Sequence, residues 1–206
     1  MKPSQLHCNF VFPRDYEVDV LDRSALGVLL GLDDAAGKLH QFPANLEEGD
    51  RVGAFLRVSP KAGSSWVGFF ALGFDSEKVA SGIYSTPDPG VLCAVVGGYG
   101  YTVHAAHPDR WSRIEPQPIL EARAVPELKL LLFTGFTAIS ALMADGERWV
   151  TERLSWEGLS ILEIDVQGRC LHGMGWDAIT DREVPFQVDL LTGGHTGGAG
   201  PAVRGR

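Results

Sequence analysis

Glycine and proline divide this chain into short segments, and that division is the feature that most constrains its fold. The 206 residues include 25 Gly and 12 Pro, and both residues favour turns over the interiors of helices. Between these turns, apolar residues either alternate with polar ones or form short runs, which is typical of strands. No apolar pattern with a helical period continues beyond two turns. We therefore predict an all-β protein, built as an antiparallel meander of short strands and hairpins.

The strand pattern is clearest in the second half of the chain. Residues 130–134 are apolar on both faces, as expected for a strand buried between two layers. Asp145-Gly146 is a strong hairpin signal between two further strands. Trp149 begins the strand after that turn, and we predict that it is buried. Residues 184–190 carry Val, Phe, Val and Leu at every second position, which predicts one core-facing row.

An internal similarity supports a repeated strand unit. Shifting the chain by 38 positions matches Leu92 with Leu130, Gly97 with Gly135, Arg110 with Arg148 and Trp111 with Trp149. Each copy has an apolar strand, a glycine, a second strand, a turn, and an Arg-Trp pair that opens a third strand. This order resembles a blade of the quinoprotein-like β-propellers, which implies propeller-like blades. A β-sandwich or an open barrel made of hairpins would give similar pairs, so these architectures stay open.

The length fits one domain. We predict a single all-β domain over residues 1–192, with the proline-rich loop around residues 87–90 as a candidate boundary between halves 1–86 and 91–192. Residues 193–206 are rich in glycine and carry little apolar surface, so the entropy cost of ordering them has little to offset it. We expect this segment to be a flexible tail.

Charge and cysteine content limit the classes of partner and the compartment. Lys and Arg number 18 against 26 Asp and Glu, giving a net charge of −8 without any basic run. This balance argues against nucleic acid or an anionic membrane as the partner. Residues 1–8 lack the apolar stretch of a signal peptide, and no apolar run is long enough to span a membrane. The three cysteines, Cys8, Cys93 and Cys170, form no C-x-x-C motif, and Cys93 has the surroundings of a small buried hydrophobe. We expect a reduced, cytoplasmic protein without a cofactor.

Residues 171–183 are the strongest candidate for chemistry. His172 could act as a general base oriented by Asp177, or the carboxylates of Asp177, Asp181 and Glu183 could hold a metal ion. The competing interpretation is structural. His172 shares a strand face with Cys170, Met174 and Trp176, which is typical of a core histidine, while Asp177 and Asp181 fit turns. We favour the structural interpretation and predict no metal site.

A second candidate lies in the connection that contains Arg153 and Trp156. A loop tryptophan between Arg and Glu could be a recognition anchor for a partner, or it could fold back over a sheet edge. Together with Asp181 and Arg182, these residues are the candidate binding residues. The C-terminal pattern from Gly175-Trp176-Asp177 to Thr192-Gly193 resembles uncharacterised bacterial proteins, and this resemblance implies no catalytic residue.

These observations predict a module that binds another protein, in an accessory or immunity-type role, rather than an enzyme. The alternative is an enzyme or small-ligand binder with a cleft around His172, Asp177 and Arg182. A carbohydrate-binding module that uses some of the five tryptophans is the third interpretation. An enzyme should show a pocket with converging polar groups, whereas an interaction module should expose apolar side chains bordered by charge.

Overall fold

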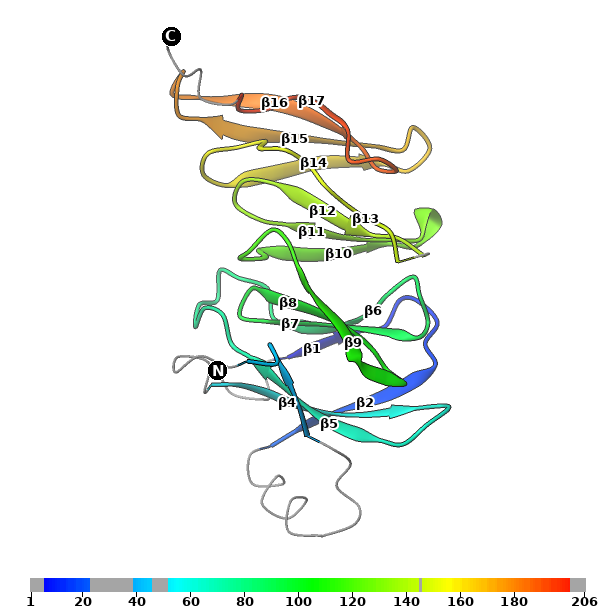
Figure 1. Cartoon of the computed structure of the whole chain (residues 1–206). Helices are drawn as coiled ribbons and strands as arrows, with labels where there is room; N and C mark the ends of the chain where they lie inside the picture. The colour runs from blue at the N-terminus through cyan, green and yellow to red at the C-terminus, as the bar shows by residue number, and fades with distance from the viewer. Residues whose placement is uncertain (1–5, 23–38, 46–51, 145, 201–206) are drawn as a thin grey trace. The chain divides into compact units, whose positions relative to one another are not determined.

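The structure is a computed structural model, which describes residues 6–22, 39–45, 52–144 and 146–200 (Figure 1). Within these ranges the chain forms strands and one short 3₁₀ turn but no α-helix, which confirms the all-β prediction. The strands divide between two compact units, Met1–Ile114 and Glu115–Arg206. Each unit is described by itself.

The N-terminal unit contains two sheets. One has the strand order β1-β6-β7-β8-β9 and the other the order β2-β4-β5-β3. All neighbouring strands are antiparallel except two pairs, β1 with β6 and β3 with β5. The strands are β1 (His7–Asn9), β2 (Tyr16–Leu21), β3 (Leu39–Phe42), β4 (Gly53–Pro60), β5 (Trp66–Ala71), β6 (Gly82–Ser85), β7 (Val91–Val96), β8 (Tyr99–His104) and β9 (His107–Ile114).

Both sheets of this unit contribute to one core. Leu56 and Phe70 from one sheet join Leu92 and Val103 from the other, and all four side chains are buried. The segment before β2 is fixed to the opposite sheet, because the backbone N–H of Phe12 donates to Oγ of Ser85 at 2.8 Å.

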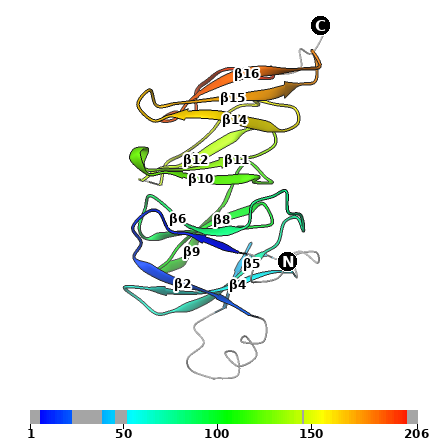
Figure 2. The same cartoon turned by 180° about the vertical axis from the view of Figure 1, so that it is seen from behind.

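The C-terminal unit contains two four-stranded antiparallel meanders, β10-β11-β12-β13 and β14-β15-β16-β17 (Figure 2). Within each sheet, every strand therefore pairs with its neighbours in sequence. The elements are β10 (Glu121–Val125), the 3₁₀ turn η2 (Pro126–Leu128), β11 (Leu130–Thr134), β12 (Ile139–Leu142), β13 (Arg148–Val150), β14 (Leu159–Asp165), β15 (Cys170–Asp177), β16 (Arg182–Asp189) and β17 (His195–Gly197).

The core of this unit also lies between its two sheets. Leu130 and Leu132 of β11 and Trp149 of β13 pack with Leu171 of β15 and Phe186 of β16. Strand β11 is buried along its whole length, as predicted for a strand between layers. The burial predicted for Trp149 is confirmed, since its side chain is 8% exposed and its Nε1–H donates to the carbonyl of Leu190 at 3.1 Å.

The 38-residue match relates equivalent strands. It aligns β7, β8 and β9 with β11, β12 and β13, and Gly97 and Gly135 both follow the first strand of each set. Trp111 and Trp149 both lie in the third strand and join the core of their own unit. The strands of the described ranges close into neither a barrel nor a propeller ring.

The division of the chain into compact units does not fall at the candidate boundary. The loop at residues 87–90 is not a boundary, because it connects two paired strands: Ser85 of β6 lies opposite Leu92 of β7. The units instead divide after Ile114.

In the part of the chain that the structure describes, no helix is long and apolar enough to cross a membrane.

The expectation of a flexible tail from residue 193 is wrong for the described part of that segment. Strand β17 pairs with β16, and the N–H of Ala199 donates to the carbonyl of Leu154 at 2.9 Å. Ala199 is 1% exposed. Glycine permits this docking, because Gly197 and Gly198 both have positive φ and lie close to neighbouring backbone. Residues 201–206 lie outside the described residues.

Candidate binding surface

The sheet β14-β15-β16-β17 has a core face and an outer face, and β15 shows the difference between them. Leu171, Gly173 and Gly175 are buried, and Leu171 belongs to the core. His172, Met174 and Trp176 alternate with them and are only half-buried. We call the side that carries these three residues the outer face.

The neighbouring strands extend the outer face. Ser160 of β14 and Pro185 of β16 lie in register with Met174, and Glu183 lies in register with Trp176. A β-bulge interrupts the pairing of β14 between Ile161 and Glu163, and it leaves Leu162 67% exposed. Bulges redirect side chains in this way. The outer face thus presents apolar side chains beside carboxylates.

His172 and Asp177 do not form the pair that the catalytic interpretation required. They are five positions apart on one extended strand, so their Cα atoms are separated by about 16 Å, and odd and even positions face opposite sides of the sheet. The expectation of a core histidine is also wrong, because the face of His172 is the outer one. Both faces of β15 are apolar in sequence, so strand periodicity could not distinguish them.

Asp177 stabilises the turn between β15 and β16. Its Oδ2 accepts a hydrogen bond from Oγ of Thr180 at 2.7 Å, and its Oδ1 accepts one from the N–H of Ile179 at 3.2 Å. The hydrogen bond from the Thr180 side chain is the main reason that the pKa of Asp177 is lowered, and the Ile179 N–H acts in the same direction. Asp181 occupies the same turn with a φ of 55°, and Arg182 lies opposite Asp177 in register. Both residues are exposed.

The connection from β13 to β14 lies against the end of β15 that carries Trp176. The N–H of Trp156 donates to the carbonyl of Trp176 at 2.8 Å, and the N–H of Trp176 donates to Oγ of Ser155 at the same distance. Gly175 permits the close approach, because a Cβ at that position would overlap the carbonyl of Leu154. The loop is therefore fixed to the end of the strand.

Arg153 and Trp156 interact with each other. The guanidinium carbon of Arg153 lies 4.0 Å from the centroid of the Trp156 ring, which is a cation–π arrangement. The indole Nε1 of Trp156 is buried and meets no hydrogen-bond acceptor of suitable geometry among the described residues. The indole nevertheless lies near enough to Asp177 to contribute to the lowering of its pKa. The structure thus brings Arg153, Trp156 and Asp177 together.

A pocket of about 330 Å³ opens between this loop and the outer face. Trp176 and Met174 form its apolar part, and Glu157 and Glu183 supply carboxylates; Gly158, Leu159 and Ser160 complete the lining. We call these seven residues the Trp176 pocket. An aromatic ring beside two carboxylates complements the side chain of a lysine or arginine, whose stem is apolar and whose head is cationic. Sequence analysis did not identify this pocket, because it assigned Met174 and Trp176 to the core.

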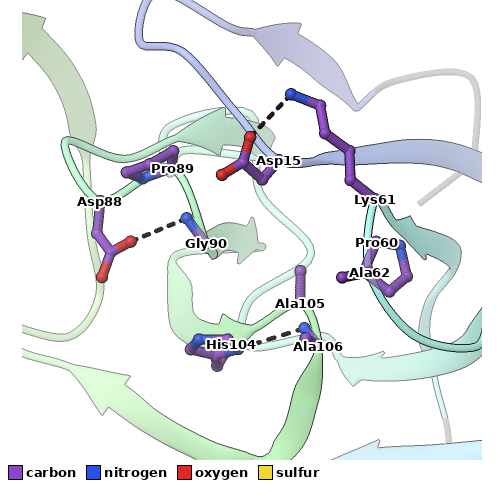
Figure 3. Close-up of a pocket in the computed structure, with 10 residues that line it drawn as sticks. All are labelled: Asp15, Pro60, Lys61, Ala62, Asp88, Pro89, Gly90, His104, Ala105 and Ala106. Atoms are coloured by element: carbon purple, nitrogen blue, oxygen red, sulfur yellow. Dashed lines mark hydrogen bonds and ion pairs between the residues drawn. The ribbon is translucent and has the colours of Figure 1, made fainter.

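A second pocket, of about 450 Å³, lies in the N-terminal unit (Figure 3). It forms where the segment before β2 meets the loops that follow β4, β6 and β8. These four segments are far apart in sequence, so no local motif could have revealed it. Asp15, Lys61, Asp88 and His104 are its titratable residues.

The polar groups of this second pocket interact mainly with one another. Nζ of Lys61 forms an ion pair with Oδ1 of Asp15 at 2.8 Å. Oδ1 of Asp88 accepts from the N–H of Gly90, also at 2.8 Å, and Nδ1 of His104 accepts from the N–H of Ala106 at 3.2 Å (Figure 3). The ion pair connects the segment before β2 with the loop after β4, and the two hydrogen bonds each lie within one loop, so all three contacts have a structural role.

Across the described ranges, no three His, Cys, Asp or Glu side chains converge in a way that could hold a metal ion. In particular, Asp177, Asp181 and Glu183 do not form the carboxylate cluster that their spacing suggested.

No protein-family model matches the chain, and no curated protein sequence matches it. Among solved structures, the extracellular domain of a putative one-component system from B. thetaiotaomicron aligns with 78% of this chain at 10% sequence identity and a TM-score of 0.37. The chain spans about a quarter of the length of that structure, since 25% of it is covered.

Proposed function

We propose that this chain is an accessory protein-binding module that binds its partner through the Trp176 pocket and the adjoining outer face. The observation that supports this proposal is the combination of half-buried Trp176 and Met174 with Glu157 and Glu183 around one open pocket. Apolar residues bordered by charge are typical of protein interaction sites. The overall charge of −8 agrees with a partner segment that carries Lys or Arg.

The two alternative functions have less support. A catalytic cleft around His172, Asp177 and Arg182 would need side chains that β15 places on opposite faces. A carbohydrate platform would need several accessible tryptophans. Trp66 and Trp149 are buried, and Arg153 lies over the ring of Trp156. An immunity-type role remains one form of the accessory function proposed here.

Location and repeat relationship are also proposals. None of the cysteines at positions 8, 93 and 170, all of which the structure describes, forms a disulfide, and this supports a reducing compartment such as the cytoplasm. The 38-residue match between β7–β9 and β11–β13 supports a relationship between these meanders and propeller blades.

The binding proposal is tested with the full chain immobilised and exposed to cytoplasmic extract of its source organism, followed by titration of the purified partner. We expect Trp176→Ala to weaken binding about tenfold, or about 1.4 kcal/mol, which lies between the values of an exposed and a desolvated cation–π contact. Glu157→Gln combined with Glu183→Gln should weaken binding and make it less sensitive to salt. Glu152→Gln, an exposed carboxylate outside the pocket, is the matched control. Unchanged affinity in both pocket variants would refute the proposal.

A further inference from the structure

We propose that Cys170 is a reactive thiol, activated by His172, that forms mixed disulfides with small disulfide compounds. The proposal concerns the opposite end of β15 from the Trp176 pocket and does not depend on the protein-binding function. Six positions separate Cys170 from Trp176, which corresponds to about 20 Å along a strand.

The first observation is the contact between the two side chains. Sγ of Cys170 lies 3.3 Å from Nε2 of His172, within hydrogen-bond distance for sulfur. The residues are two positions apart on one strand, so both side chains project to the same side of the sheet. A thiol in contact with an imidazole is the arrangement that activates a cysteine nucleophile, because the imidazole can accept the thiol proton.

The second observation is a pocket beside the thiol. Cys170 itself is 7% exposed, but it lines a pocket of about 380 Å³ together with Arg169, Gln187, Asp189, His195 and Thr196. This space offers a small reagent a route to the sulfur. Gln187 lies opposite His172 in register, and β17 supplies His195 from the adjacent strand. The pocket therefore depends on the docked C-terminal segment.

The local backbone fixes the position of Cys170. The hairpin between β14 and β15 ends at Arg169, which has a φ of 54°, and Oδ1 of Asp165 accepts a hydrogen bond from the N–H of Gly168 at 2.9 Å. Cys170 then begins β15 opposite Asp165 and Asp189. The thiol is thus held at the first position of a strand paired on both sides.

The reaction is thiol–disulfide exchange. The S–H proton of Cys170 passes to Nε2 of His172, and the thiolate forms an S–S bond with one sulfur of the small disulfide. The S–S bond of that compound breaks, and the departing thiolate takes the proton back from His172. One thiol and one disulfide become a mixed disulfide and a small thiol, so the step needs no other oxidant.

The protein carries its own reference thiols. Cys8 is exposed on β1, and Cys93 is fully buried on β7. Wild-type protein can be treated with 2-hydroxyethyl disulfide, which is uncharged, then quenched with acid and digested so that mass spectrometry follows each cysteine separately. The same measurement in concentrated urea gives the rate for each thiol without structure.

We expect Cys170 to react about tenfold or more faster in the native protein than in urea, which is within the range of general-base assistance. A merely structural cysteine that is 7% exposed would react more slowly in the native protein. A native rate at or below the urea rate would overturn the proposal, and this comparison needs no variant.

Substitution identifies the activating group. His172→Gln should reduce the native rate of Cys170 about tenfold and leave the rate of Cys8 unchanged. His195→Gln, which changes the histidine that lines the pocket, is the matched control and should have little effect. An unchanged Cys170 rate in folded His172→Gln, or equal losses in both variants, would overturn the role assigned to His172.

Discussion

Replacing Trp149 tests the core of the C-terminal unit most directly. Its side chain is 8% exposed, packs between the two sheets and donates a hydrogen bond to the carbonyl of Leu190. A buried tryptophan removes roughly 200 Å² from water, which at about 25 cal/mol per Å² gives an upper value of about 5 kcal/mol. Large-to-alanine substitutions in cores cost about 3–5 kcal/mol. We therefore expect Trp149→Ala to lower the free energy of unfolding by about 3–5 kcal/mol.

A second substitution separates packing from hydrogen bonding. Trp149→Phe keeps most of the apolar contact but removes the N–H, so its hydrogen-bond component should be about 1 kcal/mol. Urea denaturation followed by circular dichroism measures both values, and Trp176→Ala on the outer face is the control for loss of a half-exposed tryptophan. A Trp149→Ala protein with the wild-type midpoint would refute the assignment of this residue to the core.

The remaining predictions concern three other parts of the C-terminal unit. Removing residues 194–206 should lower the urea midpoint clearly, because it deletes β17 and the buried Ala199. Removing residues 201–206 eliminates none of these contacts and is the control. Equal midpoints for the two truncated proteins would show that the docking contributes no stability. Gly175→Ala should destabilise the protein by about 1–3 kcal/mol because its Cβ would overlap Leu154, while Gly200→Ala, which has open space around it, serves as the control in thermal unfolding. The pKa of Asp177 is lowered in the folded protein, so the ionised carboxylate stabilises the fold. This stabilisation is fully present at pH values above the pKa of the unfolded chain, about 3.9, and is lost as the pH falls through the lower pKa of the folded protein. Asp177→Asn should accordingly show a smaller loss of stability below about pH 4 than wild type, and identical pH profiles would contradict the role of the carboxylate.

Local sequence signals predicted much of the C-terminal unit. Alternation along β16 identified its core-facing row, and a fully apolar run identified β11 as a fully buried strand. The Asp145-Gly146 signal predicted a hairpin between two strands, and β12 and β13 pair antiparallel as expected. Asp145 itself lies outside the described residues. These features depend on neighbouring residues, which is why the sequence alone was sufficient.

The incorrect expectations depended on distant contacts or on two-sided patterns. Residues 195–199 dock because β17 pairs with β16 and Ala199 hydrogen-bonds to Leu154. Composition alone does not reveal these contacts. Both faces of β15 are apolar, and its buried glycines gave no sign of which face packs inward. Arg153, Trp156 and Asp177 were singled out from the sequence and lie together in the structure. Met174 and Glu157 were not recognised as pocket residues, because the pocket combines a loop with a strand face.

The pairing of β1 with a strand much later in the sequence affects the order of folding during synthesis. β1 pairs in parallel with β6, and the N–H of Phe12 donates to Ser85, which follows it by 73 residues. At 5–20 residues per second, a ribosome needs about 4–15 s to add that length. The first strand must wait through this interval before its partner exists, whereas each meander of the C-terminal unit can pair as soon as it emerges. The edge of β6 is therefore completed by a segment synthesised well before it, and an attachment that restricts β1 would act on this late step of folding.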